Sequence, residues 1–434
     1  MVGHHLARVL MYDKTVGALS FDPATGLSAF QFAPEWVATG VEVSPVHMPL
    51  SPSRIYQFPA LPHETFRGLP GAFADTLPDD FGNALIDAWL ARVGRDRDSF
   101  TPLERLLYTG SRGMGALEYR PAIEPVMAPA ERLELESLVA MAQEVLDQRA
   151  DVRGHLRGDN QRDALSAILQ VGTSAGGARP KAVIGINRER TEIRSGQSDL
   201  PEGFEHFLLK FDGVVEPGNQ RETFGDPQGF GRMEYAYYLM ALQAGIQMSY
   251  CELLEEGERA HFMTRRFDRD GNRKIHYQSL CAMDHADYRQ PGYYSYEQLF
   301  SLMRRLRLSR AEALQMYRRM VFNIVARNHD DHTKNIAFLM NPQGRWQLAP
   351  AFDVAYSYKP DSVWVNSHQL SLNGKRENFV RKDLLVPAQS FMREAHNIID
   401  EVIATVARWP EYAEQAGVFP DFSRQIQQQH RLLL

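Results

Sequence analysis

The most informative part of this sequence is Arg327-Asn-His-Asp-Asp-His-Thr-Lys-Asn335. It follows a segment with helical periodicity, residues 309–327, and precedes an apolar segment that predicts a strand, residues 336–340. Asp330 and Asn335 stand five positions apart, as in the catalytic loop of phosphoryl-transfer enzymes. There the carboxylate accepts the proton of the attacking hydroxyl, and the amide oxygen binds Mg²⁺. This spacing indicates a phosphoryl-transfer site.

A further carboxylate follows this loop. The apolar segment 346–350 leads into Asp353, where a carboxylate at the end of a strand can hold the metal that bridges the nucleotide phosphates. Three other interpretations stay open on the loop alone. The His-Asp-Asp-His run could bind a divalent metal by itself, it could form a solvated polar turn, or its His and Lys could complement the end of a helix.

Three upstream features fit the same chemistry. Residues 171–181 contain glycines whose backbone N–H groups could approach phosphate oxygens, although such a segment is often an ordinary turn. Lys210 lies inside the apolar segment 205–211 and needs an anionic partner if it is buried. Glu234, at the start of the predicted helix 233–244, is the candidate partner, or else an ordinary acid of a first helical turn.

The chain order of these features is more specific than any one of them. A glycine-rich loop, a strand lysine, a helix glutamate, an Asp…Asn loop and a later Asp follow one another, which is the order found in two-lobed kinases. This joint order weakens the three other interpretations of the loop.

Composition sets the class of protein. The 434 residues predict two to four domains, and 44% hydrophobic with 24% charged residues is typical of a globular enzyme. The net charge of −6 argues against whole-molecule electrostatic binding to nucleic acid. Two cysteines are too few for a disulfide scaffold. We find no signal peptide and no membrane-spanning stretch, so we expect a cytoplasmic protein.

Hydrophobic periodicity divides the chain into a small mixed module over residues 1–150, a β-rich lobe and an α-rich lobe. Strands are predicted at 9–12, 16–21, 27–32, 181–186, 205–211, 251–254 and 260–263. Helices are predicted from about 81 to 92, from 101, and at 131–149, 233–244, 297–306, 309–327 and 387–408.

Longer motifs carry a resemblance to a known family. They are Gly68–Gly82, Tyr108–Leu117, Ser174–Lys181, Arg266–Arg269, Asn328–Asn335 and Phe352-Asp353. With these motifs the sequence resembles the HipA family, the kinase toxins of bacterial toxin–antitoxin pairs, over essentially the whole chain.

The resemblance implies an α+β, two-lobed fold of the protein-kinase type. A β-rich N-terminal lobe would carry an extra small N-terminal subdomain, and the C-terminal lobe would be all-α. The implied divisions are an N-terminal subdomain at 1–120, the nucleotide-binding part of the N-lobe at 150–265, and the C-lobe at 266–434.

Site roles follow from the same resemblance, with ATP and Mg²⁺ as the implied cofactors. Asp330 resembles the catalytic base, and Asn335 and Asp353 resemble the metal ligands. The nucleotide-binding residues carried over by motif are Ser174, Ala175, Gly176, Gly177, Ala178, Lys181, Lys210, Glu234, Arg266, Phe267, Asp268, Gln278, His332 and Lys334.

Ser174 also resembles the loop serine that family members autophosphorylate. A phosphate there carries about −1.5 to −2 charges and would repel the nucleotide phosphates, so autophosphorylation would inactivate the enzyme. The neighbouring Thr173 is an alternative acceptor, and Ser174 could also be a plain turn residue.

The implied activity is that of a serine/threonine protein kinase toxin. Its implied substrate is a translation component, an aminoacyl-tRNA synthetase such as glutamyl-tRNA synthetase. The implied partner is a dimeric, operator-bound helix-turn-helix antitoxin of the HipB type. Two alternatives remain: a small-molecule phosphotransferase, and a non-catalytic transcriptional corepressor.

DNA would be reached indirectly, through the antitoxin. Local positive charge on this acidic chain makes phosphate contact with operator DNA possible at Lys375, Arg376, Arg381 and Lys382. The plainer interpretation of the same four residues is a solvated face.

Overall fold

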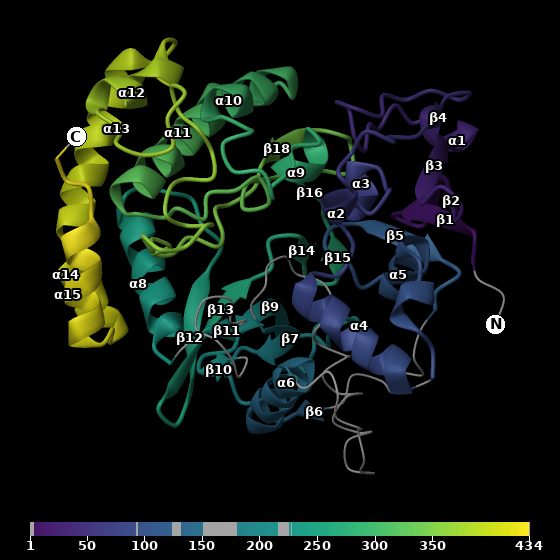
Figure 1. Cartoon of the computed structure of the whole chain (residues 1–434), viewed down its shortest axis with the longest axis horizontal. Coiled ribbons are helices and arrows are strands. Elements are labelled where there is room, and N and C mark those ends of the chain that lie inside the picture. The colour runs from purple at the N-terminus through teal and green to yellow at the C-terminus, as the bar shows by residue number, and fades with distance from the viewer. Residues whose placement is uncertain are drawn as a thin grey trace.

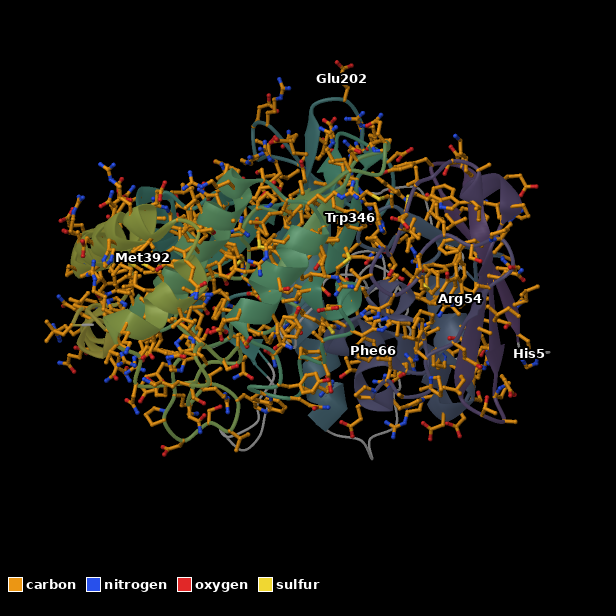
Figure 2. The ribbon with its side chains drawn as sticks, turned by 90° about the horizontal axis from the view of Figure 1, so that it is seen from above. His5, Arg54, Phe66, Glu202, Trp346 and Met392 are labelled. Carbon is orange, nitrogen blue, oxygen red and sulfur yellow. The ribbon has the colours of Figure 1, made fainter. Side chains whose placement is uncertain are left out.

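The computed structural model describes residues 4–92, 94–123, 132–150, 180–215, 225–226 and 228–433. Figure 1 shows the first strands at one end of the molecule, the last helices at the other, and a second sheet between them. Side chains labelled in Figure 2 mark the same order, with Arg54 near one end, Met392 near the other and Trp346 between.

The N-terminal part is an antiparallel sheet in the order β4-β3-β2-β1-β5. Its strands are β1 (Leu6–Met11), β2 (Lys14–Asp22), β3 (Leu27–Phe32), β4 (Ile55–Tyr56) and β5 (Leu117–Arg120). In β1 the side chains of Ala7, Val9 and Met11 are buried, because alternate residues of a strand face the same side. The three strands predicted here are confirmed.

Helices complete this part. They are α1 (Pro34–Val37), α2 (His63–Phe66), α3 (Gly71–Ala74), α4 (Asp80–Arg92), the 3₁₀ helix η1 (Arg97–Ser99) and α5 (Pro102–Thr109). The predicted helix start at residue 101 is confirmed: Thr101 Oγ1 accepts from Glu104 N at 3.2 Å, and Glu104 Oε2 accepts from Thr101 N at 2.9 Å.

The second sheet has the order β12-β13-β9-β7-β8-β6. Its strands are β6 (Arg132–Leu133), β7 (Lys181–Asn187), β8 (Ile193–Ser195), β9 (Phe204–Lys210), β12 (Cys251–Glu256) and β13 (Arg259–Arg265). Beside it lie the pair β10 (Val214–Val215) and β11 (Gly225–Asp226) and the helices α6 (Leu135–Ala150) and α8 (Phe230–Gln243).

The two faces of this sheet have different neighbours. Ala182 and Ile184 of β7 lie in one core with buried residues of α4 and α6. On the other face, Phe262 of β13 packs against Tyr238 of α8. The second face of the sheet therefore packs against α8, on the side of the C-terminal lobe.

The C-terminal lobe is largely helical. Its helices are α9 (Leu280–Met283), α10 (Tyr296–Arg305), α11 (Arg310–Val325), α12 (Arg381–Leu385), η2 (Val386–Ala388), α13 (Met392–Ala407), α14 (Trp409–Ala416) and α15 (Pro420–Gln429). The expectation of an all-α lobe is wrong in one respect, because this lobe also contains strands. They are β14 (Arg269–Asp270), β15 (Arg273–Lys274), β16 (His276–Ser279), β17 (Ala337–Met340) and β18 (Trp346–Leu348), the last three forming a sheet of their own.

The N-terminal part packs on both lobes. Its sheet shares one continuous core with helices of the C-terminal lobe. Its helix α4 belongs to the core of the second sheet. The Trp346 indole N–H donates to Glu42 O at 3.2 Å, which adds a polar contact between β18 and the N-terminal part. No helix in the described part of the chain is long and apolar enough to cross a membrane.

Candidate active site between the lobes

Lys210 joins three parts of the molecule. Its Nζ lies 2.6 Å from Glu234 Oε1 of α8 and 2.5 Å from Asp353 Oδ1, which follows β18. The side chain of Lys210 is 7% exposed and that of Glu234 is 3% exposed, so the pair is removed from water. The contact expected between the strand lysine and the helix glutamate is present, and it extends to the carboxylate expected to bind metal.

The sheet register explains this position. Lys210 of β9 pairs with Lys181 of β7 on one side and with Phe262 of β13 on the other, and directly paired residues share a face. Helix α8 approaches this face closely, because a Cβ on Gly231 would lie 2.0 Å from Ala260 O. The helix therefore begins where Glu234, one turn later, reaches Lys210.

Lys181 adds a second buried cation beside the first. Its Nζ lies 3.4 Å from Asp79 Oδ2, at the start of α4. Burial lowers the pKa of Lys181, while the charges of Asp79 and Asp353 oppose that effect. Two buried lysines thus lie near Asp353, and the N-terminal part contributes Asp79 as the counter-charge of Lys181.

The predicted catalytic loop, residues 327–335, is anchored by the second of its two aspartates. Asp331 Oδ1 accepts from Gln369 N at 2.7 Å. Its Oδ2 accepts from the Tyr296 hydroxyl at 2.7 Å and lies 2.9 Å from His368 Nδ1. The Asp331 side chain is 0% exposed, whereas that of Asp330 is 40% exposed. Asp331 fixes the backbone, and Asp330 keeps an accessible carboxylate.

Asn335 closes the loop onto Asp330. Asn335 Nδ2 donates to the Asp330 carbonyl oxygen at 2.9 Å, and Asn335 N donates to His332 O at 2.9 Å. His332 Nε2 lies 3.6 Å from Asp330 Oδ1. The amide nitrogen of Asn335 is used within the loop, which leaves its amide oxygen as the atom available to a cation.

The donor set fits a hard divalent cation such as Mg²⁺. Asn335 and Asp353 line the same cavity, beside Asp331 and Asn328. An amide oxygen and a carboxylate are ligands that Mg²⁺ accepts, with water or phosphate oxygens completing its shell. Asp353 also has a left-handed backbone, with φ of 53°, an uncommon state in non-glycine residues that is often found at functional sites.

The histidine-based alternative finds no support here. Among the residues that the structure describes, no group of three or more His, Cys, Asp and Glu side chains could hold a metal ion. His329 is buried against the His368 ring, with centroids 4.1 Å apart. Burial first, and then the neighbouring His368 and Arg327, lowers the pKa of His329 to about 2, so the ring is neutral.

Phe267 and Asp268, which were both predicted to bind the nucleotide, lie in different surroundings. Phe267 is half-buried, with its ring centroid 5.3 Å from that of Phe352, the neighbour of Asp353. Asp268 is buried and receives bonds from Arg266, Arg269 and Gly115 N. Although burial alone would raise it, the two guanidiniums hold the pKa of Asp268 well below its ordinary value.

Asp268 and Arg266 therefore make contacts that hold the fold together. Asp268, held by Arg266, ties the segment between the lobes to the loop around Gly115, whose φ of +76° and close approach to Tyr277 N require glycine. Arg266 binds Asp268, Asp268 also binds this loop, and the nucleotide contact of the two residues stays a prediction.

The other predicted site residues either have partners elsewhere or lie outside the described residues. Gln278 is 0% exposed and its amide nitrogen donates to Val43 O at 2.6 Å, and its nucleotide contact stays a prediction. Lys334 lies over the Tyr288 ring at 4.9 Å, in the field of Asp75. Ser174, Ala175, Gly176, Gly177 and Ala178, with the alternative acceptor Thr173, lie outside the described residues.

The four candidate DNA contacts are largely engaged within the chain. Lys375 Nζ lies 2.7 Å from Asp383 Oδ2, Arg376 Nε donates to His368 O at 2.7 Å, and Arg381 NH1 lies 2.7 Å from Asp400 Oδ1. Lys382 is exposed.

Comparison with known proteins decides the family. The family model described as the HipA-like C-terminal domain matches residues 173–409, and the model described as the HipA N-terminal domain matches residues 7–120. The chain belongs to the HipA family. No curated protein sequence matches it.

A solved HipA structure agrees with this fold. The chain is similar to HipA from Shewanella oneidensis MR-1, solved with HipB and operator DNA, at a TM-score of 0.64 and 17% identity, covering 98% of this chain and 96% of that chain. A weaker likeness is to the proinflammatory kinase CtkA of Helicobacter pylori, with a TM-score of 0.33, 11% identity and coverage of 51% and 90%.

The site of this HipA-family chain also contains residues to which the sequence alone assigned no role. Asp79 sits within the motif Gly68–Gly82, but nothing in its spacing points to Lys181. Phe352 was visible only as the neighbour of Asp353, and Asp331 only as the neighbour of Asp330. A pair of adjacent acids in a catalytic loop is the signal that would have suggested one anchoring and one reacting carboxylate.

Proposed function

We propose that this chain is an ATP- and Mg²⁺-dependent serine/threonine protein kinase. The observation that carries the proposal is the position of Lys210, buried between Glu234 and Asp353 at 2.6 Å and 2.5 Å. Such a lysine binds nucleotide phosphates when a helix glutamate holds it and a metal-binding aspartate lies beside it. The accessible Asp330, on an adjacent rigid loop, supplies a candidate base.

Each residue then has one task. Lys210 and Lys181 neutralise phosphate charge, and Glu234 keeps Lys210 directed at the site. Asn335 and Asp353 would hold Mg²⁺, which neutralises charge on the phosphates when bound. Asp330 orients the acceptor hydroxyl and takes its proton. Phe267 and Phe352 offer an apolar surface for the base of the nucleotide.

We further propose that this kinase is the toxin of a toxin–antitoxin pair. The Shewanella HipA to which the chain is similar was solved with HipB and operator DNA. By this analogy the partner would be a HipB-type antitoxin bound to its operator, and the substrate would be an aminoacyl-tRNA synthetase. Autophosphorylation at Ser174 would end activity, because a phosphate in the nucleotide loop repels ATP.

Labelling of a lysate tests the proposed activity. Purified protein is mixed with bacterial lysate, Mg²⁺ and ATP carrying a labelled γ-phosphate, beside Asp330→Ala and Asp353→Ala. We expect a labelled protein band with the wild type, a loss of at least about 100-fold in either variant, and growth arrest on expression of the wild type alone. Asp361→Ala, which removes an exposed acid from the segment that follows Asp353, is the control.

Two outcomes would contradict the proposal. Labelled metabolites without labelled protein would indicate a small-molecule phosphotransferase. ATP binding without any transfer, together with operator binding in the presence of an antitoxin, would indicate a corepressor.

A further inference from the structure

The catalytic loop begins at a residue with an uncommon backbone. Arg327, the second residue after α11, has φ of 58°, a left-handed conformation that is disfavoured for a non-glycine residue. This residue turns the chain from the helix into the loop that carries Asp330. Such a conformation persists where surrounding contacts hold it.

Glu377 is one of the groups that hold Arg327. Its Oε1 lies 2.9 Å from Arg327 NH1 and 2.8 Å from Arg431 NH1, so one carboxylate oxygen joins two guanidiniums. Its Oε2 lies 3.5 Å from Nε2 of His329, the residue before Asp330. The Glu377 side chain is 26% exposed, so the bonds are partly shielded from water and gain strength from their low dielectric surroundings.

The segment after α15 completes this arrangement. Arg431 N donates to Val325 O at 2.8 Å, and Arg327 Nε donates to Gln429 O at 2.8 Å. Residues 429–431 therefore bond the last carbonyl of α11, Val325 O, and the side chain of Arg327. Figure 1 shows α15 ending near α8 and the helices of the C-terminal lobe.

Helix α8 touches the same point. The Tyr237 hydroxyl donates to Ala326 O at 2.6 Å and lies 3.1 Å from His430 Nε2. Glu234, which binds Lys210, is three residues earlier and so on a neighbouring part of the same helical face. One helix thus connects the phosphate lysine, the start of the catalytic loop and the segment 429–431.

We propose that Glu377 and Arg431 are positioning residues that hold Arg327 and thereby set the direction of the catalytic loop, including Asp330. The inference rests on the proposed kinase function, because it assigns these residues an effect on phosphate transfer. Neither side chain contacts a reacting atom in this assignment, and both act through Arg327.

The test compares Arg431→Ala with a matched control. Arg318 has the same kind of surroundings as Arg431: its side chain is 18% exposed against 17%, and NH1 bonds one carboxylate, Glu401, and one carbonyl, Ala244 O. We expect Arg431→Ala to lower kcat on the order of 10- to 100-fold with KM for ATP nearly unchanged, since ångström-scale misplacement of a base costs this much. Arg318→Ala should keep kcat, and Arg431→Lys should recover part of it.

Hydrogen exchange gives a readout that does not depend on activity. Amides of residues 326–335 should exchange faster in Arg431→Ala than in Arg318→Ala, and faster again in Glu377→Gln combined with Arg431→Ala. Equal loop protection in Arg431→Ala and Arg318→Ala would overturn the inference, as would a change in KM for ATP alone. A wild type without transfer but with these exchange differences would refute the proposed function and leave the positioning of the loop standing.

Discussion

Replacing Lys210 by Met should be costly to stability as well as to nucleotide binding. The change removes the ammonium between Glu234 and Asp353 and leaves both carboxylates without it. Removing one partner of a buried ion pair costs about 3–5 kcal/mol. Asp353 is 26% exposed and can turn toward water, whereas Glu234 is 3% exposed and cannot. We therefore expect a loss near the lower bound, about 3 kcal/mol.

Urea unfolding followed by tryptophan fluorescence measures this loss. Lys375→Met is the control, because Lys375 also pairs with a buried carboxylate, Asp383 at 2.7 Å, but is itself 44% exposed. We expect about 1 kcal/mol or less for Lys375→Met. The double variant Lys210→Met/Glu234→Leu should recover at least half of the Lys210→Met loss, since it removes the stranded charge. A Lys210→Met loss below about 1 kcal/mol would refute the account of this buried pair.

Three further predictions concern other parts of the structure. Asp79→Asn should lower the free energy of unfolding by about 2 kcal/mol, because it strips a counter-charge from the buried Lys181; an unchanged urea midpoint would contradict the link between the N-terminal part and the site. Burial lowers the pKa of His276 to about 4 in the folded protein, whereas the value in an unfolded chain is about 6.5. As the pH falls, the unfolded state therefore binds a proton that the folded state does not bind, and stability decreases. The free energy of unfolding of wild type should therefore fall by about 1.4 kcal/mol more than that of His276→Gln when the pH is lowered from 7.5 to 5.5. A constant difference between the two free energies would argue against a buried neutral ring. Alanine at all four candidate DNA contacts should reduce the salt slope of operator binding by a toxin–antitoxin complex by about 1, mainly through the exposed Lys382; an unchanged affinity and slope would remove DNA contact from these residues, Lys375, Arg376, Arg381 and Lys382.

Local patterns predicted the elements and the central contact well. The prediction of a catalytic loop rests on the spacing of Asp330 and Asn335, which involves only neighbours along the chain, and the structure shows their backbone and side-chain contact. The contact of Lys210 with Glu234 follows from a charge that must be compensated inside an apolar strand. In both cases the residue that needs a partner and the partner itself belong to the same ordered set of motifs, so the sequence alone can suggest the pair.

Long-range pairings were beyond reach. Asp79 and Lys181 meet because α4 lies under β7, and no periodicity in either segment encodes that packing. The strand β16 was not predicted, because its buried residues His276 and Gln278 are polar and pack against Val43 of the N-terminal part. Without apolar residues at alternate positions, this sequence is typical of a loop. The sheet of the C-terminal lobe therefore could not be predicted in full.

Asp268 shows that a charged residue predicted to bind a ligand can also have partners within the fold. Its neighbours Arg266 and Arg269 were visible in the sequence, and together they supply its counter-charge. A carboxylate flanked by two arginines is as well suited to a buried structural joint as to a ligand. The local sequence cannot distinguish these uses, because burial is decided by the loop around Gly115.

Intact mass measurement tests the central claim most directly. Purified protein is incubated with Mg²⁺ and ATP, beside Asp330→Ala, and phosphopeptides are then mapped. We expect one added phosphate on the wild type, at Ser174, and none on Asp330→Ala. Measurable ATP binding by the wild type with no added phosphate, and with no labelled protein in a lysate, would contradict the claim that these residues form a kinase site.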